Sequence, residues 1–257
     1  MMDWTDSHCR YFMRLLNPNI LLYTEMITAD ALLFGNKRKY LQYNDEEHPI
    51  ALQLGGSDPR KMKQAAIIGA DYGYDEINLN IGCPSDRVQQ GSFGLCLMAK
   101  PKLVAECTNA IIEAVNIPVT IKTRIGIDDL DNYDFLCNFI EIVAASGCSQ
   151  FIIHARKAIL SGLSPKENRS IPKLNYDRVY RLKSDYKNLH ISVNGGINSV
   201  KECEEHLALL DGVMIGRHAY HQPWFLYELG ILNASHKKSN TTREDIIEKM
   251  YPYIESQ

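Results

Sequence analysis

Apolar and polar positions along the chain alternate in a way that predicts strands and helices in regular succession. Short apolar runs with a period of two indicate strands, and apolar residues three and four apart indicate helices. The run from Glu76 to Ile81 is the clearest strand, with its apolar side chains on one face. Seven strands are predicted, over 19–25, 49–54, 76–81, 118–123, 150–155, 190–194 and 212–215. Helices are predicted over 8–16, 30–34, 59–69, 101–116, 132–146, 176–185 and 199–209.

Strands separated by helices imply parallel strands, so the fold class is α/β, either a doubly wound sheet or a (β/α)8 barrel. The polar residues decide between the two, because a doubly wound sheet places its site at one switch point, whereas a barrel collects it from all strand ends. Here every predicted strand carries polar candidates at or just after its end: Glu25, Gln53, Asn80 with Cys83, Lys122 with Arg124, His154 with Arg156, Asn194 with Gly195 and Gly196, and Gly216 with Arg217. The sequence therefore predicts a (β/α)8 TIM barrel.

Both ends of the chain carry expectations of their own. An eighth strand is missing from the count, and the chain opens with a turn and a helix, so we expect the first strand to lie before Met1. After a polar link over 236–240, Thr241 and Glu244 have capping-box spacing and predict a new helix. Ile246, Met250 and Tyr253 give it an apolar stripe, and nothing after Gln257 covers that stripe. We expect a barrel domain over 1–235 and the first helix of a truncated helical domain over 241–257.

Composition excludes several classes of protein. With 257 residues, 45% hydrophobic and 23% charged, the chain is an ordinary soluble protein with a full core. Its seven cysteines include no CxxC pair, so neither a disulfide framework nor a zinc ribbon is supported, and a reducing cytoplasm fits best. No signal peptide and no apolar run of membrane-spanning length, about 20 residues, is present.

Charge is strongly segregated along the chain. The net charge is −3, but nine Lys or Arg and only three acids lie between Arg156 and Lys187, so this segment carries +6 and the remainder −9. A local basic face of this kind is what phosphate-backbone binding needs. The alternative is a solvated helix face with incidental lysines.

The loop that follows the third strand holds the most reactive candidate. Cys83 stands just past the end of that strand, next to Pro84, and Gly91 and Gly94 lead on to Cys96. The simpler reading of Cys83 is a small apolar core residue, but core cysteines lie within periodic segments and this one lies in a loop punctuated by Gly and Pro.

The last two strands add a phosphate site and no metal site. Backbone amides of the Asn194–Gly196 turn and of Gly216, supported by Arg217, are placed where barrels hold a phosphate. His218 and His221 lack a third ligand nearby, so we expect them to be structural and expect no metal.

Longer motifs carry a family resemblance from Met1 to about Leu232. They are MMDWTDSHCRYF, LLYTEM, EEHPIALQLGGSDP, GYDEINLNIGCPSDRVQQGSFGLCLM, TIKTRIGIDD, FIIHARKAILSGLSPKENRSIP, NGGI and DGVMIGR. In these motifs the sequence resembles the bacterial tRNA-dihydrouridine synthases, close to their A subfamily. The resemblance implies an FMN-bound barrel that uses NADPH to reduce the uracil C5=C6 bond in the tRNA D-loop, at positions 20 and 20a. It also implies that the tail begins a helical domain that grips tRNA.

The resemblance further implies roles for individual residues. Cys83 would be the catalytic acid, and Asn80, Lys166 and Arg169 would contact the RNA. FMN would be held by Met1, Met2, Asp3, Gln53, Lys122, His154, Asn194, Gly195, Gly196, Gly216 and Arg217. Protein partners stay open, with a monomer as one option.

The chemistry of uracil reduction agrees with these roles. Hydride delivery to C6 leaves an enolate that needs a proton at C5, and a thiol of pKa about 8.5 keeps its proton at neutral pH. A uracil of folded tRNA must also be extruded to reach a barrel mouth, which favours a basic rim.

Two rival functions remain at this stage. One is a Schiff-base aldolase or lyase with Lys122 as nucleophile, in which Cys83 and the basic segment would have no role. The other is an inactive remnant that keeps RNA or flavin binding. The incomplete ends make this second rival concrete, and we expect weak FMN retention and low turnover until both ends are extended.

Overall fold

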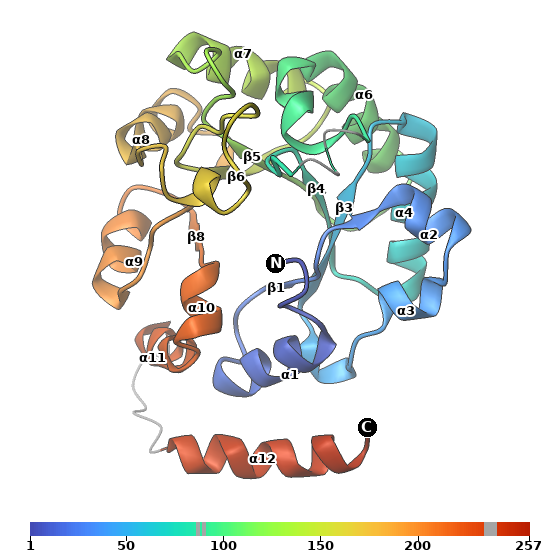
Figure 1. Ribbon diagram of the computed structural model, residues 1–257, viewed down its shortest axis with the longest axis vertical. Coiled ribbons are helices and arrows are strands. Elements are labelled where there is room, and N and C mark those ends of the chain that lie inside the picture. The colour runs from blue at the N-terminus through green and yellow to red at the C-terminus, as the bar shows by residue number, and fades with distance from the viewer. Residues whose placement is uncertain (86–87, 89–90, 234–240) are drawn as a thin grey trace.

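The computed structural model describes residues 1–85, 88, 91–233 and 241–257, and helices surround one sheet of parallel strands (Figure 1). Residues 86, 87, 89 and 90 of the Cys83 loop, the last two residues of the expected domain 1–235, and the predicted link 236–240 lie outside the described residues. The strand order is β1-β3-β4-β5-β6-β7-β8, with β2 also paired to β3. This arrangement confirms the predicted (β/α)8 class.

The strands are close to those predicted, except near the start. They span β1 Leu22–Tyr23, β2 Ile27–Thr28, β3 Ile50–Gly55, β4 Glu76–Asn80, β5 Val119–Arg124, β6 Gln150–His154, β7 His190–Asn194 and β8 Gly212–Met214. The strand predicted over 19–25 is present but shorter, as β1, and the sequence analysis missed β2, which follows it; both pair with β3. In the part of the chain that the structure describes, β1 and β8 do not pair with each other, and the N-terminus lies inside the ring (Figure 1).

Helices follow the strands and cover the outside of the ring. They are α1 Ser7–Leu16, α2 Ala29–Phe34, α3 Lys37–Leu41, α4 Pro59–Tyr72, α6 Pro101–Ile112, α7 Tyr133–Ala144, α8 Tyr176–Asp185, α9 Val200–Leu207, α10 Arg217–His221, α11 Trp224–Asn233 and α12 Arg243–Glu255. Short 3-10 helices lie at η1 Asp45–Glu47, η2 Gly94–Ala99 and η3 Glu167–Arg169. No helix among the described residues is long and apolar enough to cross a membrane.

Helix α4 shows how sequence sets an element and its packing. Asp58 accepts hydrogen bonds from the amides of Arg60 and Lys61, and Pro59 occupies the first turn, where its missing N–H is harmless. The helix runs past the predicted end at Gly69 and stops at Gly73, whose φ of 107° suits glycine. A side chain at Gly69 would come within 2.4 Å of Leu52, so this glycine lets α4 lie directly on β3.

The two faces of the sheet differ in character. Leu52 and Ile77 face outward against α4, and both are fully buried. Each such side chain contributes about 1.5–3 kcal/mol of hydrophobic stabilisation. Because side chains alternate along a strand, the neighbouring residues Gln53, Glu76 and Asn78 face the inside of the ring. The inner face of β3, β4 and β5 is therefore polar, and it leads toward the strand ends where the site lies.

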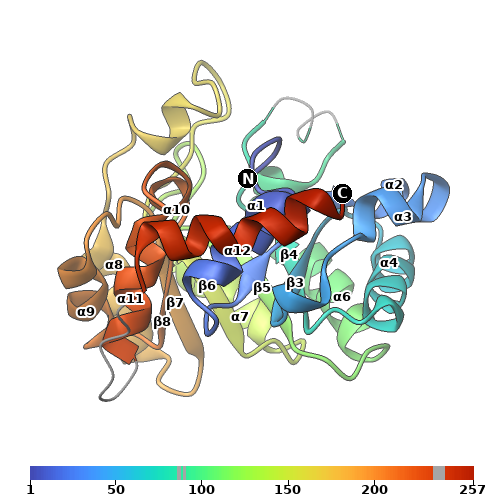
Figure 2. The same cartoon turned by 90° about the horizontal axis from the view of Figure 1, so that it is seen from below.

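Helix α12 corrects the expectation for the tail. Its capping box uses Thr242 and Asp245 rather than Thr241 and Glu244. The apolar stripe is also covered: Ile246 and Tyr253 are buried, and Figure 2 shows α12 lying across α1. The Tyr253 ring stacks on Tyr11 at 3.9 Å, and its hydroxyl lies 2.6 Å from His8 Nδ1. The prediction that nothing covers this stripe was wrong, because the first helix of the barrel covers it.

Candidate active site

The sequence-predicted site residues converge at the carboxyl ends of the strands. Strand register places Asn80 beside Lys122, and His154 beside Asn194. Gln53 of β3 reaches the same group, because its carbonyl oxygen accepts a hydrogen bond from Asn80 Nδ2 at 2.9 Å. The long loop after β6 and the N-terminus project from the same end of the sheet (Figure 2). The structure thus brings residues from five strands to one mouth.

Lys122 is held near the centre of this group. Its Nζ donates to Asn194 Oδ1 at 3.1 Å, and Asn194 Nδ2 donates to the Met214 carbonyl of β8 at 2.8 Å. Burial, with a further contribution from the neighbouring Arg124, lowers the pKa of Lys122 to about 8. The ammonium is therefore poorly compensated by the protein, which favours an acceptor or anion supplied by a ligand.

Cys83 lies at the mouth on a loop that several contacts fix. Asn80 Oδ1 accepts hydrogen bonds from the amides of Gly82 at 3.0 Å and Cys83 at 2.9 Å. Arg124 Nε donates to the Gly82 carbonyl at 2.9 Å. The thiol is half-buried and lies 3.5 Å from the Ser85 hydroxyl, a weak contact that leaves it accessible.

Cys96, the second cysteine of this loop, has a different setting. It lies within η2, its thiol donates to the Phe93 carbonyl at 3.0 Å, and burial raises its pKa. Its proton is already engaged with backbone, whereas Cys83 lies against Asn80 and Arg124 at the strand ends. Cys83 is therefore the better placed of the two to act on a ligand.

Positive charge gathers around His154. Burial lowers the pKa of His154 well below its usual value, with further lowering by Arg124, Lys122, Arg156 and Arg217. Its imidazole is neutral at pH 7 as a result. We call Lys122, Arg124, Arg156, Arg169 and Arg217 the cation cluster. Among the charged groups that act on His154, Arg124 and Lys122, no Asp or Glu of the described chain appears.

Two orphaned nitrogens strengthen the case for an anion. The Nε atoms of Arg156 and Arg169 are buried and have no hydrogen-bond partner among the residues that the structure describes. Arg217 joins the pair, since its Nη2 donates to the Arg169 carbonyl at 3.0 Å. A buried donor without a partner is costly, and an anionic group with several acceptor oxygens would satisfy it.

The glycine turns after β7 and β8 have backbone geometry that requires or permits glycine. Gly195 and Gly196 have φ values of 112° and 75°, a region that glycine adopts without strain. A side chain at Gly195 would come within 2.4 Å of His154 Cδ2, so only glycine lets this turn and the imidazole meet. A side chain at Gly216 would meet nothing within 4 Å, so its backbone stands open to a ligand.

The predicted residues of the N-terminal turn and of the RNA group are spread more widely. Met1 is half-buried, and its amine lies near Lys122 and Glu25, while Met2 and Asp3 are exposed. Lys166 immediately precedes η3 and Arg169 is its last residue, but only Lys166 is exposed. Arg169 turns inward and joins the cation cluster.

Arg124 is the functional residue that sequence reasoning left without a role. It links three segments around the mouth, since beyond Gly82 its Nη1 donates to the carbonyls of Lys157 and Asn168. Its position at the end of the fourth predicted strand was the available signal. Its three carbonyl partners, however, are close only in the folded chain.

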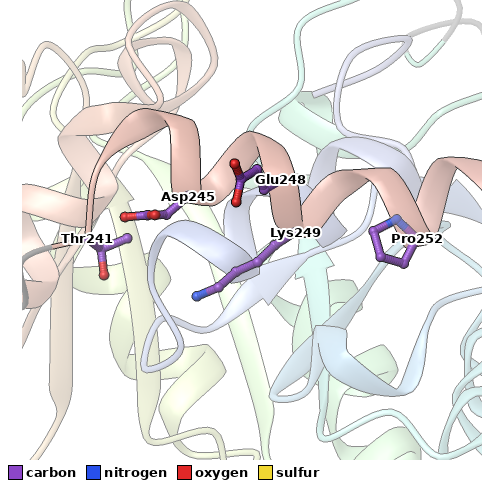
Figure 3. Close-up of a pocket in the computed structure, with 5 residues that line it drawn as sticks. All are labelled: Thr241, Asp245, Glu248, Lys249 and Pro252. Carbon is purple, nitrogen blue, oxygen red and sulfur yellow. The ribbon is translucent and has the colours of Figure 1, made fainter.

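Two other features carry no site. Within the described residues there is no group of three or more His, Cys, Asp or Glu side chains that could hold a metal, and His218 and His221 pack against Phe225 and Trp4. A hollow of about 530 Å³ lies beside α12 (Figure 3). Its lining residues, Thr241, Asp245, Glu248, Lys249 and Pro252, belong to one helix and its lead-in, so among the described residues no second element converges on it.

Comparison with known proteins identifies this architecture. The family model for dihydrouridine synthases matches residues 1–257. The chain belongs to the dihydrouridine synthase family. It is 59% identical over 256 residues to the tRNA-dihydrouridine(20/20a) synthase of Shewanella oneidensis, an alignment that covers 100% of this chain and 76% of that protein.

Two further relatives of this dihydrouridine synthase family member carry the same name. The Vibrio vulnificus protein is 58% identical over 258 residues, covering 100% of this chain and 79% of the relative. The protein of Escherichia coli K12 is 58% identical over 262 residues, covering 99% of this chain and 74% of the relative. The resemblance seen in the sequence motifs is confirmed.

Proposed function

We propose that the chain reduces uridine to 5,6-dihydrouridine in the D-loop of tRNA, at positions 20 and 20a, with FMN as cofactor and NADPH as electron donor. The observation that carries this proposal is the half-buried thiol of Cys83 facing an uncompensated cation cluster, in a chain of the dihydrouridine synthase family. Relatives named tRNA-dihydrouridine(20/20a) synthase support the substrate and the positions.

The residues at the mouth fit FMN. A phosphate would meet the open Gly216 backbone, the Gly195–Gly196 turn and the orphaned arginine nitrogens. Gln53, Lys122 and Asn194 would contact the ring system from the inner face of the barrel, and the turn of Met1, Met2 and Asp3 would cover it. Arg217 and the neutral His154 complete the set. When bound, the flavin supplies hydride chemistry at the uracil C6.

Cys83 would then provide the proton. Hydride addition at C6 breaks the C5=C6 π bond and places an electron pair at C5, conjugated with the O4 carbonyl. The Cys83 thiol donates its proton to C5, forming the C–H bond and leaving a thiolate that solvent reprotonates. Lys122 and Arg124 lie close enough to Cys83 to interact with it electrostatically, so positive charge stands beside the proposed proton donor.

The basic segment would hold the RNA. Asn80 at the mouth would contact the extruded base, and the exposed Lys166 and the Arg169 turn would contact the backbone beside it. We assign catalysis to residues 1–235, acting in the cytoplasm, and assign 241–257 to the helical region that grips tRNA.

One feature also suits the rival Schiff-base enzyme, namely the pKa of Lys122 near 8. That rival gives no role to Cys83 or to the arginines of the cation cluster. Membership of the dihydrouridine synthase family favours the reductase.

The test separates the two halves of the reaction. Cys83→Ala should bind flavin and permit its reduction by NADPH at the parent rate, while dihydrouridine formation falls by about 10²- to 10⁴-fold, the usual contribution of a general acid. Cys96→Ala is the matched control and should keep most activity. Parent-level dihydrouridine formation in Cys83→Ala, or loss of flavin reduction, would contradict the assigned role.

A further inference from the structure

A series of side-chain hydrogen bonds crosses the inner face of the barrel and ends at the Cys83 backbone. Glu76, Asn78 and Asn80 lie two residues apart on β4 and share that face, with Gln53 of β3 and Thr120 of β5 on either side. Thr120 Oγ1 donates to Glu76 Oε1 at 2.6 Å, and Asn78 Nδ2 donates to Thr120 Oγ1 at 2.8 Å.

The part of the hydrogen-bond series nearer the mouth has the same direction of donation. Gln53 Nε2 donates to Asn78 Oδ1 at 2.9 Å, and Asn80 Nδ2 donates to Gln53 Oε1 at 2.9 Å. Asn80 Oδ1 then receives the amides of Gly82 and Cys83. Every donor points toward Glu76, so the side chains form one head-to-tail series.

The groups at both ends of this series require the same direction of hydrogen-bond donation. Backbone amides can only donate, so Asn80 must turn its oxygen toward Gly82 and Cys83, and its nitrogen then faces Gln53. At the other end Glu76 Oε1 accepts from the hydroxyls of both Thr120 and Tyr23, so Thr120 uses its hydrogen there and offers a lone pair to Asn78. The three side-chain amides between them have one orientation that satisfies every member.

The series occupies the barrel interior, where apolar side chains would be expected for stability alone. Barrel interiors are usually filled by Val, Ile and Leu. Here Asn78 is fully buried, and Thr120 and Glu76 are 2% and 6% exposed. Burial raises the pKa of Glu76, while the hydrogen bonds from Thr120 and Tyr23 oppose that rise. Among the described residues the side-chain hydrogen bonds of this carboxyl come from Thr120 and Tyr23, and the one from Thr120 leads on toward the mouth.

We propose that Glu76 is a positioning residue for the proposed reaction, acting through Thr120, Asn78 and Gln53 on Asn80 and so on the Gly82–Cys83 backbone. The series also makes Gln53 and Asn80 hydrogen-bond donors at the mouth, since each keeps one amide hydrogen outside it and both are half-buried. The ligand they face must present acceptors there, such as ring carbonyl oxygens. This inference deepens the proposed function at the same site.

Amide exchange tests the proposal without flavin, tRNA or turnover. Labelling the chain with 15N-cysteine gives one signal for each of the seven cysteines, so Cys83 is read against six internal references. The Cys83 signal is assigned by its absence in Cys83→Ala. Thr120→Val removes the hydroxyl and keeps the shape, and should speed exchange of the Cys83 amide by at least about tenfold, as expected when a hydrogen-bonded group loses its fixed partner.

Two controls separate positioning from general loosening. Thr120→Ser keeps the hydroxyl and should exchange like the parent. Tyr23→Phe removes the other hydrogen bond to the same Glu76 oxygen, at 2.9 Å, yet Tyr23 is not on the path to Cys83. It should lower the unfolding temperature about as much as Thr120→Val while leaving Cys83 exchange unchanged.

A double-mutant cycle adds a functional readout. The kcat losses of Thr120→Val and Asn80→Ala should be strongly non-additive, because either change interrupts the same series. If valine is not tolerated, Thr120→Ala removes the same hydroxyl without added bulk. Unchanged Cys83 exchange in the hydroxyl-free variant, or equal acceleration in Tyr23→Phe, overturns the proposal. Failure of the chain to reduce uridine would leave the exchange result standing and would contradict only the proposed function.

Discussion

Replacing Lys122 with methionine should make the ligand-free chain more stable at pH 7 and should lower the flavin content of the protein. The folded-state pKa of Lys122 is about 8 against an ordinary value of 10.5. Below pH 8 both folded and unfolded chains carry the charged lysine, and the folded chain bears the cost of burying it. The difference of about 2.5 pH units corresponds to an upper limit of about 3 kcal/mol.

Part of that gain is lost with the hydrogen bond that Lys122 makes. Methionine leaves Asn194 Oδ1 without its donor, which costs about 1–2 kcal/mol. The net stabilisation at pH 7 is then about 1–2 kcal/mol, or a rise of about 2–8 °C in unfolding temperature for a chain of this size. Flavin content should fall because methionine offers no donor to the ring system.

The sign of the pH dependence gives the sharpest check. As pH rises from 8 toward 10.5, the folded parent releases the lysine proton and recovers its stability, so the advantage of the variant should shrink. Thermal unfolding of both flavin-free proteins between pH 7 and 9.5 measures this. Lys122→Arg keeps the charge and should show no stabilisation. A lower unfolding temperature for Lys122→Met at pH 7, or a gap that does not change with pH, would refute the reasoning.

Two further predictions concern the rim of the site. Lys166→Ala with Arg169→Ala should weaken tRNA binding and flatten its dependence on salt, since fewer phosphate contacts release fewer counterions. An unchanged salt slope would remove η3 from the interface. Gly195→Ala should lower stability and flavin content more than Gly162→Ala, because both have positive φ but only Gly195 lies against His154. Equal losses in the two variants would show that backbone strain alone is responsible.

The sequence predicted helices and strands well where the segment was long enough to show a period of apolar residues. The strand over 190–194 and the helix over 176–185 match the structure residue for residue. The short strands β1 and β2 and the helix α3 are too brief for a period to be read. Thr241 and Thr242 are adjacent, and either residue suits an N-cap. In the structure Thr242 is the N-cap, and Asp245, three residues later, completes the capping box.

The sequence predicted which residues gather at the strand ends, but it did not predict the hydrogen bonds between them. Residues at strand ends converge in any parallel barrel, so Gln53, Asn80, Lys122 and His154 could be grouped from the sequence alone. Their hydrogen bonds could not, because they depend on register. A shift of one residue between β3 and β4 would point Gln53 at a different neighbour and reverse the face it lies on.

The polar interior and the cation cluster place different demands on the same barrel. From Glu76 to Cys83 each side-chain amide has a partner within the chain, so burial there costs little beyond what its hydrogen bonds return. Around His154, within the part of the chain that the structure describes, the arginines have no carboxylate partner and two of their nitrogens have no hydrogen-bond partner. The outward Leu and Ile side chains against the helices offset that local cost. Under the proposed function, the satisfied amides would hold the Cys83 loop in place and the unsatisfied arginines would receive an anion, and this division follows from which strand positions carry amides and which carry cations.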